Sequence, residues 1–99
     1  MLCGGISSQA RAATAEIQQL VQAVKEEVEK KEGRSFEVFD AVEYKTQTVA
    51  GINYFVKVQT GKDEYLHLRI HKSLPHEKKP PALTSYQSNK EKQEELSYF

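Results

Sequence analysis

The chain of 99 residues contains only one cysteine, Cys3. One cysteine cannot form an intrachain disulfide, so packing and hydrogen bonds must hold the fold together. The first residues contain neither a positively charged segment nor an apolar core, and therefore do not resemble a secretory signal peptide. The lack of an intrachain disulfide and the lack of a signal peptide together predict a location in the cytoplasm or the nucleus.

The chain also lacks an excess of either charge, since 14 Lys and Arg residues balance 14 Asp and Glu residues. Nucleic-acid-binding domains usually carry a basic excess on one face, so this balance argues against a nucleic-acid partner. The pairs Lys30-Lys31 and Lys78-Lys79 are interpreted as solvated surface. No apolar stretch approaches the length of a membrane span, so we expect no association with a membrane.

The length suits one domain, residues 1–99, because a chain of this size has no room for a second core. Within it we expect a flexible N-terminal segment, residues 1–12, and a polar C-terminal tail, residues 89–99. Leu96, Tyr98 and Phe99 give that tail apolar groups that can pack back on the domain. We expect a monomer by default, with a domain-swapped dimer or a dimer linked through Cys3 as alternatives.

An amphipathic helix is predicted from Thr14 to Glu32. Apolar residues recur there at steps of three and four, and polar residues fill the opposite face. Thr14 is a suitable N-cap, and Gly33 can supply the left-handed conformation in which helices commonly end. The apolar stripe consists of Ile17, Leu20, Val21, Val24 and Val28.

After Gly33 the apolar residues recur at every second position, which is typical of strands with one buried face. Asp40 interrupts the first such row and is a candidate bulge. We predict three strands in an antiparallel meander and then a weaker edge strand, over residues 36–48, 52–59, 65–71 and 83–88. The fold class is therefore α+β, with one long helix packed across a four- to five-stranded antiparallel sheet.

The connection between the first two strands departs from ordinary hairpin chemistry. Tight hairpins favour Asn-Gly or Asp-Gly, because the preferred turns require positive φ. Here the connection is Gln47-Thr48-Val49-Ala50-Gly51, in which only Gly51 meets that requirement and Val49 is apolar. A bulged turn with one harmless exposed valine is one interpretation. A contact site is the other, because failures of local rules concentrate at functional sites.

A second apolar connection, Leu74-Pro75-His76-Glu77, follows the third strand. Alternate connections of a meander lie at the same end of the sheet, so we predict that this turn and the Val49 turn are neighbours. Clustered exposed apolar groups mark interaction sites, whereas isolated ones are common on any surface. The pair of turns therefore favours a contact site.

The N-terminal segment is long enough to reach the same end of the sheet, at about 3.3 Å per residue. It contains Leu2 and the pair Gly4-Gly5, and adjacent glycines let the backbone approach another surface closely. A frayed terminus is the simpler interpretation, since most N-termini are of that kind.

Other candidate chemistry is weaker, and no cofactor or metal is implied. Cys3 has no sequence neighbour that would activate it as a nucleophile. His67 and His71 have the spacing of a helical zinc pair, but on a strand four residues span about 13 Å. Zinc ligands must converge within about 2 Å of one ion, which excludes a site built on that pair. The chain also lacks a phosphate-binding glycine loop and a pocket for acid–base residues, so we expect no enzyme.

The three unusual places carry a resemblance to the stefins, the type 1 cystatins. The matching segments are Met1-Leu2-Cys3-Gly4 for the stefin N-terminus, Gln47-Thr48-Val49-Ala50-Gly51 for the Gln-x-Val-x-Gly signature, and Leu74-Pro75-His76-Glu77 for the second hairpin. The resemblance continues through Asn53-Tyr54-Phe55 and Leu96-Ser97-Tyr98-Phe99, and so runs the length of the chain. Thr48 departs from the usual pattern, which has valine there.

The resemblance implies a cystatin fold and a reversible, tight-binding, competitive inhibitor of papain-like cysteine proteases such as cathepsins L, S, H and B. The N-terminal segment and the two hairpin loops would form a wedge that enters the active-site cleft. Carried over to this chain, Gly4 is the reactive-site glycine, and the protease-binding residues are Gly4, Gln47, Thr48, Val49, Ala50, Gly51, Leu74, Pro75 and His76. A non-inhibitory cystatin-like binding module is the alternative, because a fold does not fix a function.

Overall fold

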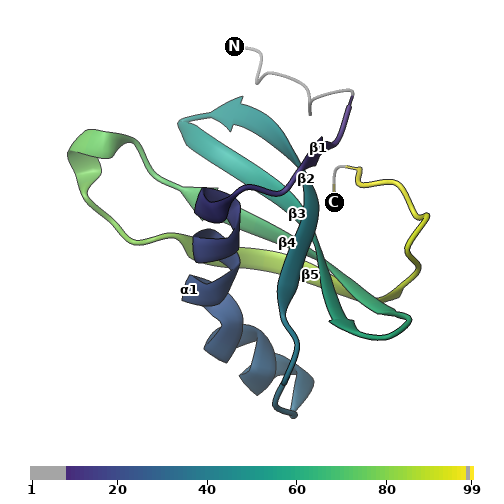
Figure 1. Cartoon of the computed structure of the whole chain (residues 1–99). Helices are drawn as coiled ribbons and strands as arrows, with labels where there is room; N and C mark the ends of the chain where they lie inside the picture. Colours follow the sequence, from purple (N-terminus) through teal and green to yellow (C-terminus); the bar gives the residue numbers. More distant parts are fainter. Residues whose placement is uncertain (1–8, 98) are drawn as a thin grey trace.

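The computed structural model describes residues 9–97 and residue 99. Within these residues one α-helix and five strands form, and each strand pairs antiparallel with the next along the chain. The elements are β1 (Arg11–Ala12), α1 (Ala15–Glu32), β2 (Asp40–Val49), β3 (Gly51–Gly61), β4 (Glu64–Lys72), the 3₁₀ turn η1 (Pro75–Glu77) and β5 (Ala82–Lys90). Figure 1 shows α1 lying across one face of the sheet, which confirms the predicted α+β class and the meander.

The helix α1 has the ends that its sequence predicts. Thr14 is the N-cap, and its hydroxyl oxygen accepts a hydrogen bond from the backbone N–H of Ile17 at 3.3 Å. Gly33 ends the helix with a φ of 73°, and its N–H donates to the carbonyl of Glu29 at 2.8 Å. All residues of the predicted apolar stripe are buried. No helix in the described part of the chain is long and apolar enough to cross a membrane.

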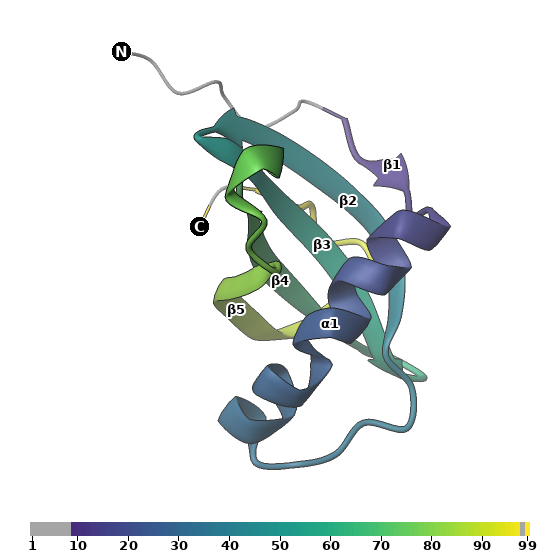
Figure 2. The same cartoon turned by 90° about the vertical axis from the view of Figure 1, so that its left-hand side faces the viewer.

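The helix and the sheet share one hydrophobic core. The stripe on α1 packs against side chains at alternating positions of β3 and β4, which point to the same face of the sheet. The strand residues in this core include Tyr54, Val56, Val58, Leu66, Leu68 and Ile70. Figure 2 shows α1 running obliquely over the strands, so that a single helix covers several of them.

The first long strand begins later than the alternation predicts, at Asp40 and not near Phe36. Phe36 and Phe39 are both buried, and their ring centroids lie 5.4 Å apart in the loop after α1. The side-chain amides of Gln18 and Gln22 each donate to the carbonyl of Phe39 at 3.1 Å. Because these bonds from the helix occupy a backbone group that a strand partner would use, the ladder starts only after Phe39.

The bulge predicted at Asp40 is also displaced, since the register shifts between Ala41 and Glu43. The backbone N–H of Ala41 donates to the side chain of Gln18 at 2.7 Å. This bond again attaches the start of β2 to the helix, and the regular pairing with β3 resumes from Glu43.

The two edges of the sheet differ from the sequence-based boundaries. Arg11 and Ala12, placed in the N-terminal segment by their sequence position, form β1 and pair with β2. At the other edge β5 runs to Lys90, so residues 89 and 90 belong to the sheet and the tail comprises residues 91–99. Asn89 has a φ of 58°, a left-handed conformation that asparagine tolerates, next to a register shift that extends the strand.

The C-terminal tail covers the face of the sheet opposite α1 (Figure 2). Leu96 is fully buried, and the ring of Phe99 meets that of Phe55 edge to face with centroids 5.7 Å apart. The predicted packing of the tail is thus confirmed for Leu96 and Phe99, while Tyr98 lies outside the described residues.

Three cationic side chains, of which Lys45 and Lys57 are buried, attach this tail to the sheet. The ammonium group of Lys45 donates to the main-chain oxygen of Leu96 at 2.7 Å, and that of Lys57 donates to the main-chain oxygen of Lys92 at 2.6 Å. The guanidinium of Arg69 donates to the main-chain oxygen of Phe99 at 2.8 Å. These charge-assisted bonds offset the cost of taking cationic groups out of water.

Candidate functional site

The β2–β3 hairpin is closed by Val49, Ala50 and Gly51, with Val49 paired to Gly51. Gly51 has a φ of 109°, which confirms the expected positive φ and which side chains of L-residues rarely allow. A Cβ atom at this position would also overlap the carbonyl oxygen of Lys72 and lie 3.2 Å from Ser73 Cα. Only glycine therefore lets the hairpin approach the end of β4 this closely.

The second connection contains the short 3₁₀ turn η1, in which the backbone N–H of Glu77 donates to the carbonyl of Leu74 at 3.0 Å. Leu74 is 38% exposed, which makes it one of the two exposed large apolar side chains among the described residues. His76 is exposed within the turn. The connection thus presents an apolar and a polar side chain to solvent together.

The structure brings the two connections together, as the meander topology predicts. Both project from the sheet near the N-terminal end of α1, whereas the β3–β4 turn lies at the far end (Figure 1). A groove on the helix side joins them, lined by Thr48, Val49, Gly51, Ile52, Tyr54, Lys72, Ser73 and Leu74. Burial raises the pKa of the Tyr54 phenol and the carboxylate of Glu16 adds to the effect, so the groove holds a neutral tyrosine at pH 7.

On the opposite face, a row of polar side chains lies behind the hairpin. The register places Gln47 beside Asn53 and Asn53 beside His71. The amide nitrogen of Asn53 is 3.1 Å from the side-chain oxygen of Gln47, and its oxygen is 2.9 Å from Nδ1 of His71. Sequence reasoning considered Gln47 as a contact residue and His71 as a zinc ligand, but it missed this link. The available signal was the pairing of neighbouring strands, which sets these three positions side by side.

A second hollow lies next to this row, under the hairpin tip. It is lined by Val49, Ala50, Asn53, Arg69, His71 and Thr84. Together with the groove on the helix side, it leaves the tip of the hairpin bordered by open space on both faces of the sheet. The tip is therefore accessible to a partner from either side.

Gly4 lies outside the described residues, as do Leu2 and Gly5, so the structure does not place the predicted reactive-site glycine. What it does show is the direction of β1. Followed backwards from Ala12 to Arg11, β1 runs along β2 from Glu43 to Tyr44, which is toward the hairpin tip.

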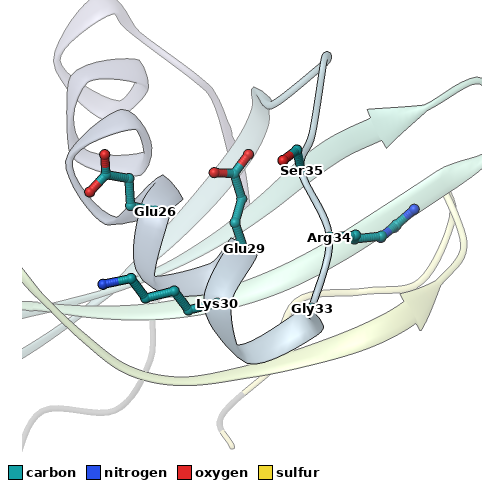
Figure 3. A pocket seen from close by; sticks show the side chains of 6 residues that line it. All are labelled: Glu26, Glu29, Lys30, Gly33, Arg34 and Ser35. Carbon is teal, nitrogen blue, oxygen red and sulfur yellow. The ribbon is translucent and has the colours of Figure 1, made fainter.

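The remaining hollows do not assemble catalytic groups. One lies at the C-terminal end of α1, where Figure 3 shows the charged ends of the Glu26, Glu29 and Lys30 side chains lying apart from one another. The carboxylate of Glu29 accepts a hydrogen bond from the backbone N–H of Phe36 at 2.8 Å, and Arg34 forms a salt bridge with Glu64 at 2.7 Å. Among the described residues, no group of three His, Cys, Asp or Glu side chains could hold a metal ion.

Residues 4–93 of the chain match the cystatin domain. The chain belongs to the cystatin family. It is 54% identical to cystatin-B of Bos taurus and 50% identical to cystatin-B of Homo sapiens, in each case over 100% of both chains. It is also 52% identical to stefin-C of Bos taurus, covering 97% of this chain and 94% of that protein. The resemblance to the stefins inferred from the motifs is thereby confirmed.

Membership of the cystatins makes this chain a cysteine protease inhibitor by family, with cysteine proteases as its class of partner, and not an enzyme. The fold agrees with that assignment, since one helix on a five-stranded antiparallel sheet is the arrangement that the stefin resemblance implied. In this cystatin, the Gln-x-Val-x-Gly segment is the β2–β3 hairpin, and the stefin second hairpin is the connection that contains η1.

Proposed function

We propose that this cystatin is a reversible, tight-binding, competitive inhibitor of papain-like cysteine proteases, among them cathepsins L, S, H and B. The inhibitory surface is a wedge that enters the active-site cleft. Its residues are Gly4, Gln47, Thr48, Val49, Ala50, Gly51, Leu74, Pro75 and His76. The observation that carries the proposal is the convergence of two apolar connections at one end of the sheet.

The geometry of the two loops favours tight binding. The first loop is held between β2 and β3, and the second lies between β4 and β5, so each is fixed at both ends by strands. Loops ordered before binding lose little conformational entropy on docking. Val49 and Leu74 supply the apolar surface that gains from desolvation in a cleft.

The direction of β1 supports a role for the N-terminal segment. Each step back along β1 corresponds to one step forward along β2, because Arg11 pairs with Tyr44 and Ala12 with Glu43. Followed backwards, β1 thus leads toward the end of the sheet that carries the two loops, which is where the proposal needs Gly4. This supports Gly4 as the reactive-site glycine, where the backbone can approach the protease without a side chain.

The wedge needs no covalent step. It covers the catalytic residues of the protease with loops that pack against the cleft, and it offers no peptide bond aligned for attack. Inhibition is therefore reversible, and the inhibitor remains uncut. We place the inhibitor in the cytoplasm or nucleus, because proteins of these compartments rarely contain disulfides and a chain with one cysteine cannot form one within itself. We also propose that it acts as a monomer.

The test is a titration of papain with a fluorogenic substrate, comparing the wild type with Val49→Asp and Val38→Asp. Val38 is an exposed valine that precedes β2, so it lies at the opposite end of that strand from the hairpin. A carboxylate buried unpaired in the cleft costs about 3 kcal/mol, so Val49→Asp should raise the inhibition constant roughly 100-fold. Val38→Asp should inhibit like the wild type.

Circular dichroism must show that both variants are folded. Wild-type affinity for a folded Val49→Asp variant would remove the first loop from the interface. A wild type that leaves papain fully active would contradict the proposal itself and favour a binding module without inhibitory activity.

A further inference from the structure

We propose that Asn53 and His71 are positioning residues for the first inhibitory loop, acting through Gln47; this inference rests on the proposed function. The three side chains lie in one row across β2, β3 and β4, on the face opposite α1. His71 contacts Asn53, and Asn53 in turn contacts Gln47, the first residue of the signature.

The hydrogen bonds fix the orientation of each group in the row. Asn53 donates through its amide nitrogen to Gln47 Oε1 at 3.1 Å, so its own oxygen faces the imidazole. That oxygen lies 2.9 Å from His71 Nδ1, and an amide oxygen can only accept, so Nδ1 is the donor in this bond. Asn53 is only 5% exposed, so solvent cannot easily replace either partner.

His71 also lies against the other arm of the hairpin. Its Cε1 atom is 3.2 Å from the position where a Cβ atom of Gly51 would stand. The imidazole thus borders Gly51 directly and is linked to Gln47 through Asn53. The imidazole therefore restrains both strands of the hairpin, one on each side of the tip.

The hairpin tip has open space on both of its sides. Val49 borders the groove on the helix face and the hollow on the opposite face. The hydrogen bonds from Lys45 and Arg69 to the described part of the tail lie one step back on this face, away from the tip. The polar row is therefore the last side-chain layer before the tip, and it reduces the freedom that the loop must lose on binding.

A purely structural role for the row would lower the stability of the variants without changing how the folded protein binds. A double-mutant cycle on inhibition separates the two roles. The variants are His71→Phe, which keeps a ring of similar size without the hydrogen bond, Gln47→Ala, and the combination of both. His71→Asn is the conservative variant, because its amide nitrogen can take the place of Nδ1.

We expect His71→Phe to raise the inhibition constant for papain about three- to tenfold, as for the loss of one net hydrogen bond. In the Gln47→Ala background the same substitution should change it less than about twofold, because the residue through which His71 acts is gone. His71→Asn should restore most of the affinity. Thr84→Val, in the same hollow but outside the row, should inhibit like the wild type.

Amide hydrogen exchange of the free inhibitor gives a second readout. The backbone amides of Thr48 and Ala50 should exchange faster in His71→Phe than in the wild type or Thr84→Val. Equal effects of His71→Phe in the wild-type and Gln47→Ala backgrounds, or unchanged inhibition and exchange, would overturn the inference. If the wild type fails to inhibit papain, the proposed function fails, and the exchange rates alone then decide whether the row braces the hairpin.

Discussion

Acidification should destabilise this cystatin through His67. The imidazole is only 2% exposed, and its Nε2 atom has no hydrogen-bond partner among the described residues. Burial, with smaller contributions from the ammonium groups of Lys90 and Lys57, lowers the pKa of His67 from 6.5 to about 4. The carboxylates of Glu94 and Glu43 oppose this shift but do not cancel it. His67 is therefore buried in its neutral form.

The sign and size of the effect follow from proton binding. Between pH 6.5 and about pH 4 the unfolded chain binds a proton at His67 that the folded chain excludes. The free energy of unfolding therefore decreases as the pH is lowered through this range. The pKa values of 6.5 unfolded and about 4 folded give a loss of about 2 kcal/mol at pH 5 and about 3 kcal/mol at pH 4. A small domain has a total stability of only about 5–15 kcal/mol, so the loss is substantial.

Urea denaturation followed by circular dichroism, from about pH 7 down to pH 4, measures this dependence. Carboxylates also titrate in this range, so the decisive quantity is the difference between the wild type and His67→Leu. The leucine variant takes up no proton at this position and should lose about 2 kcal/mol less than the wild type by pH 5. His76→Gln removes an exposed imidazole and should follow the wild type. Parallel curves for the wild type and His67→Leu would refute the reasoning.

Three further substitutions test other parts of the fold. Gly51→Ala combines a strained φ with overlap of the Lys72 carbonyl, so we expect a loss of about 2–3 kcal/mol in urea denaturation and at least tenfold weaker inhibition of papain. As a control, the Cβ atom added by Gly61→Ala in the other hairpin meets only side-chain atoms of Glu64 at 3.4 Å or more, so this variant should stay within about 1 kcal/mol of the wild type. Equal losses of stability in both variants would contradict the requirement for glycine at position 51. Phe99→Ala removes the edge-to-face contact with Phe55 and should lower the free energy of unfolding by about 1–2 kcal/mol, whereas an unchanged value would mean that the tail adds no stability through this ring.

The elements predicted correctly are those whose signals are local. The boundaries of α1 follow from Thr14 and Gly33, which act within one turn of their own positions, and from a stripe with helical spacing. The neighbourhood of the two apolar connections follows from topology, because a meander allows no other arrangement of alternate turns. Neither inference needs information about distant residues.

The start of β2 was predicted wrongly because distant residues decide it. Phe36 and Val38 fit a strand alternation, but Phe36 instead pairs with Phe39 in the loop, and Val38 is 40% exposed. The bonds from Gln18 and Gln22 to Phe39 join positions 21 and 17 residues apart. A pattern read along the chain cannot contain them.

The second face of the sheet illustrates the same limit. Lys45, Lys57 and His67 alternate with apolar residues, and such a pattern predicts a solvated face. All three are nevertheless buried, because the tail returns to the sheet and its main-chain oxygens accept from the two ammonium groups. The sequence shows the apolar residues at the end of the tail. It does not show that main-chain oxygens of the tail accept hydrogen bonds from the buried ammonium groups, which makes their burial tolerable.

The two covers of the sheet explain where the binding surface can lie. The helix α1 covers one face, and the tail covers the other through Lys45, Lys57 and Arg69. Toward the hairpin tip, the next side chains on the second face form the polar row of Gln47, Asn53 and His71, which bond to one another. Stability is therefore concentrated in the covered part of the sheet, and the end beyond the row can keep apolar residues exposed for a partner. A protein this small can support such a surface only because the rest of its sheet is buried on both faces.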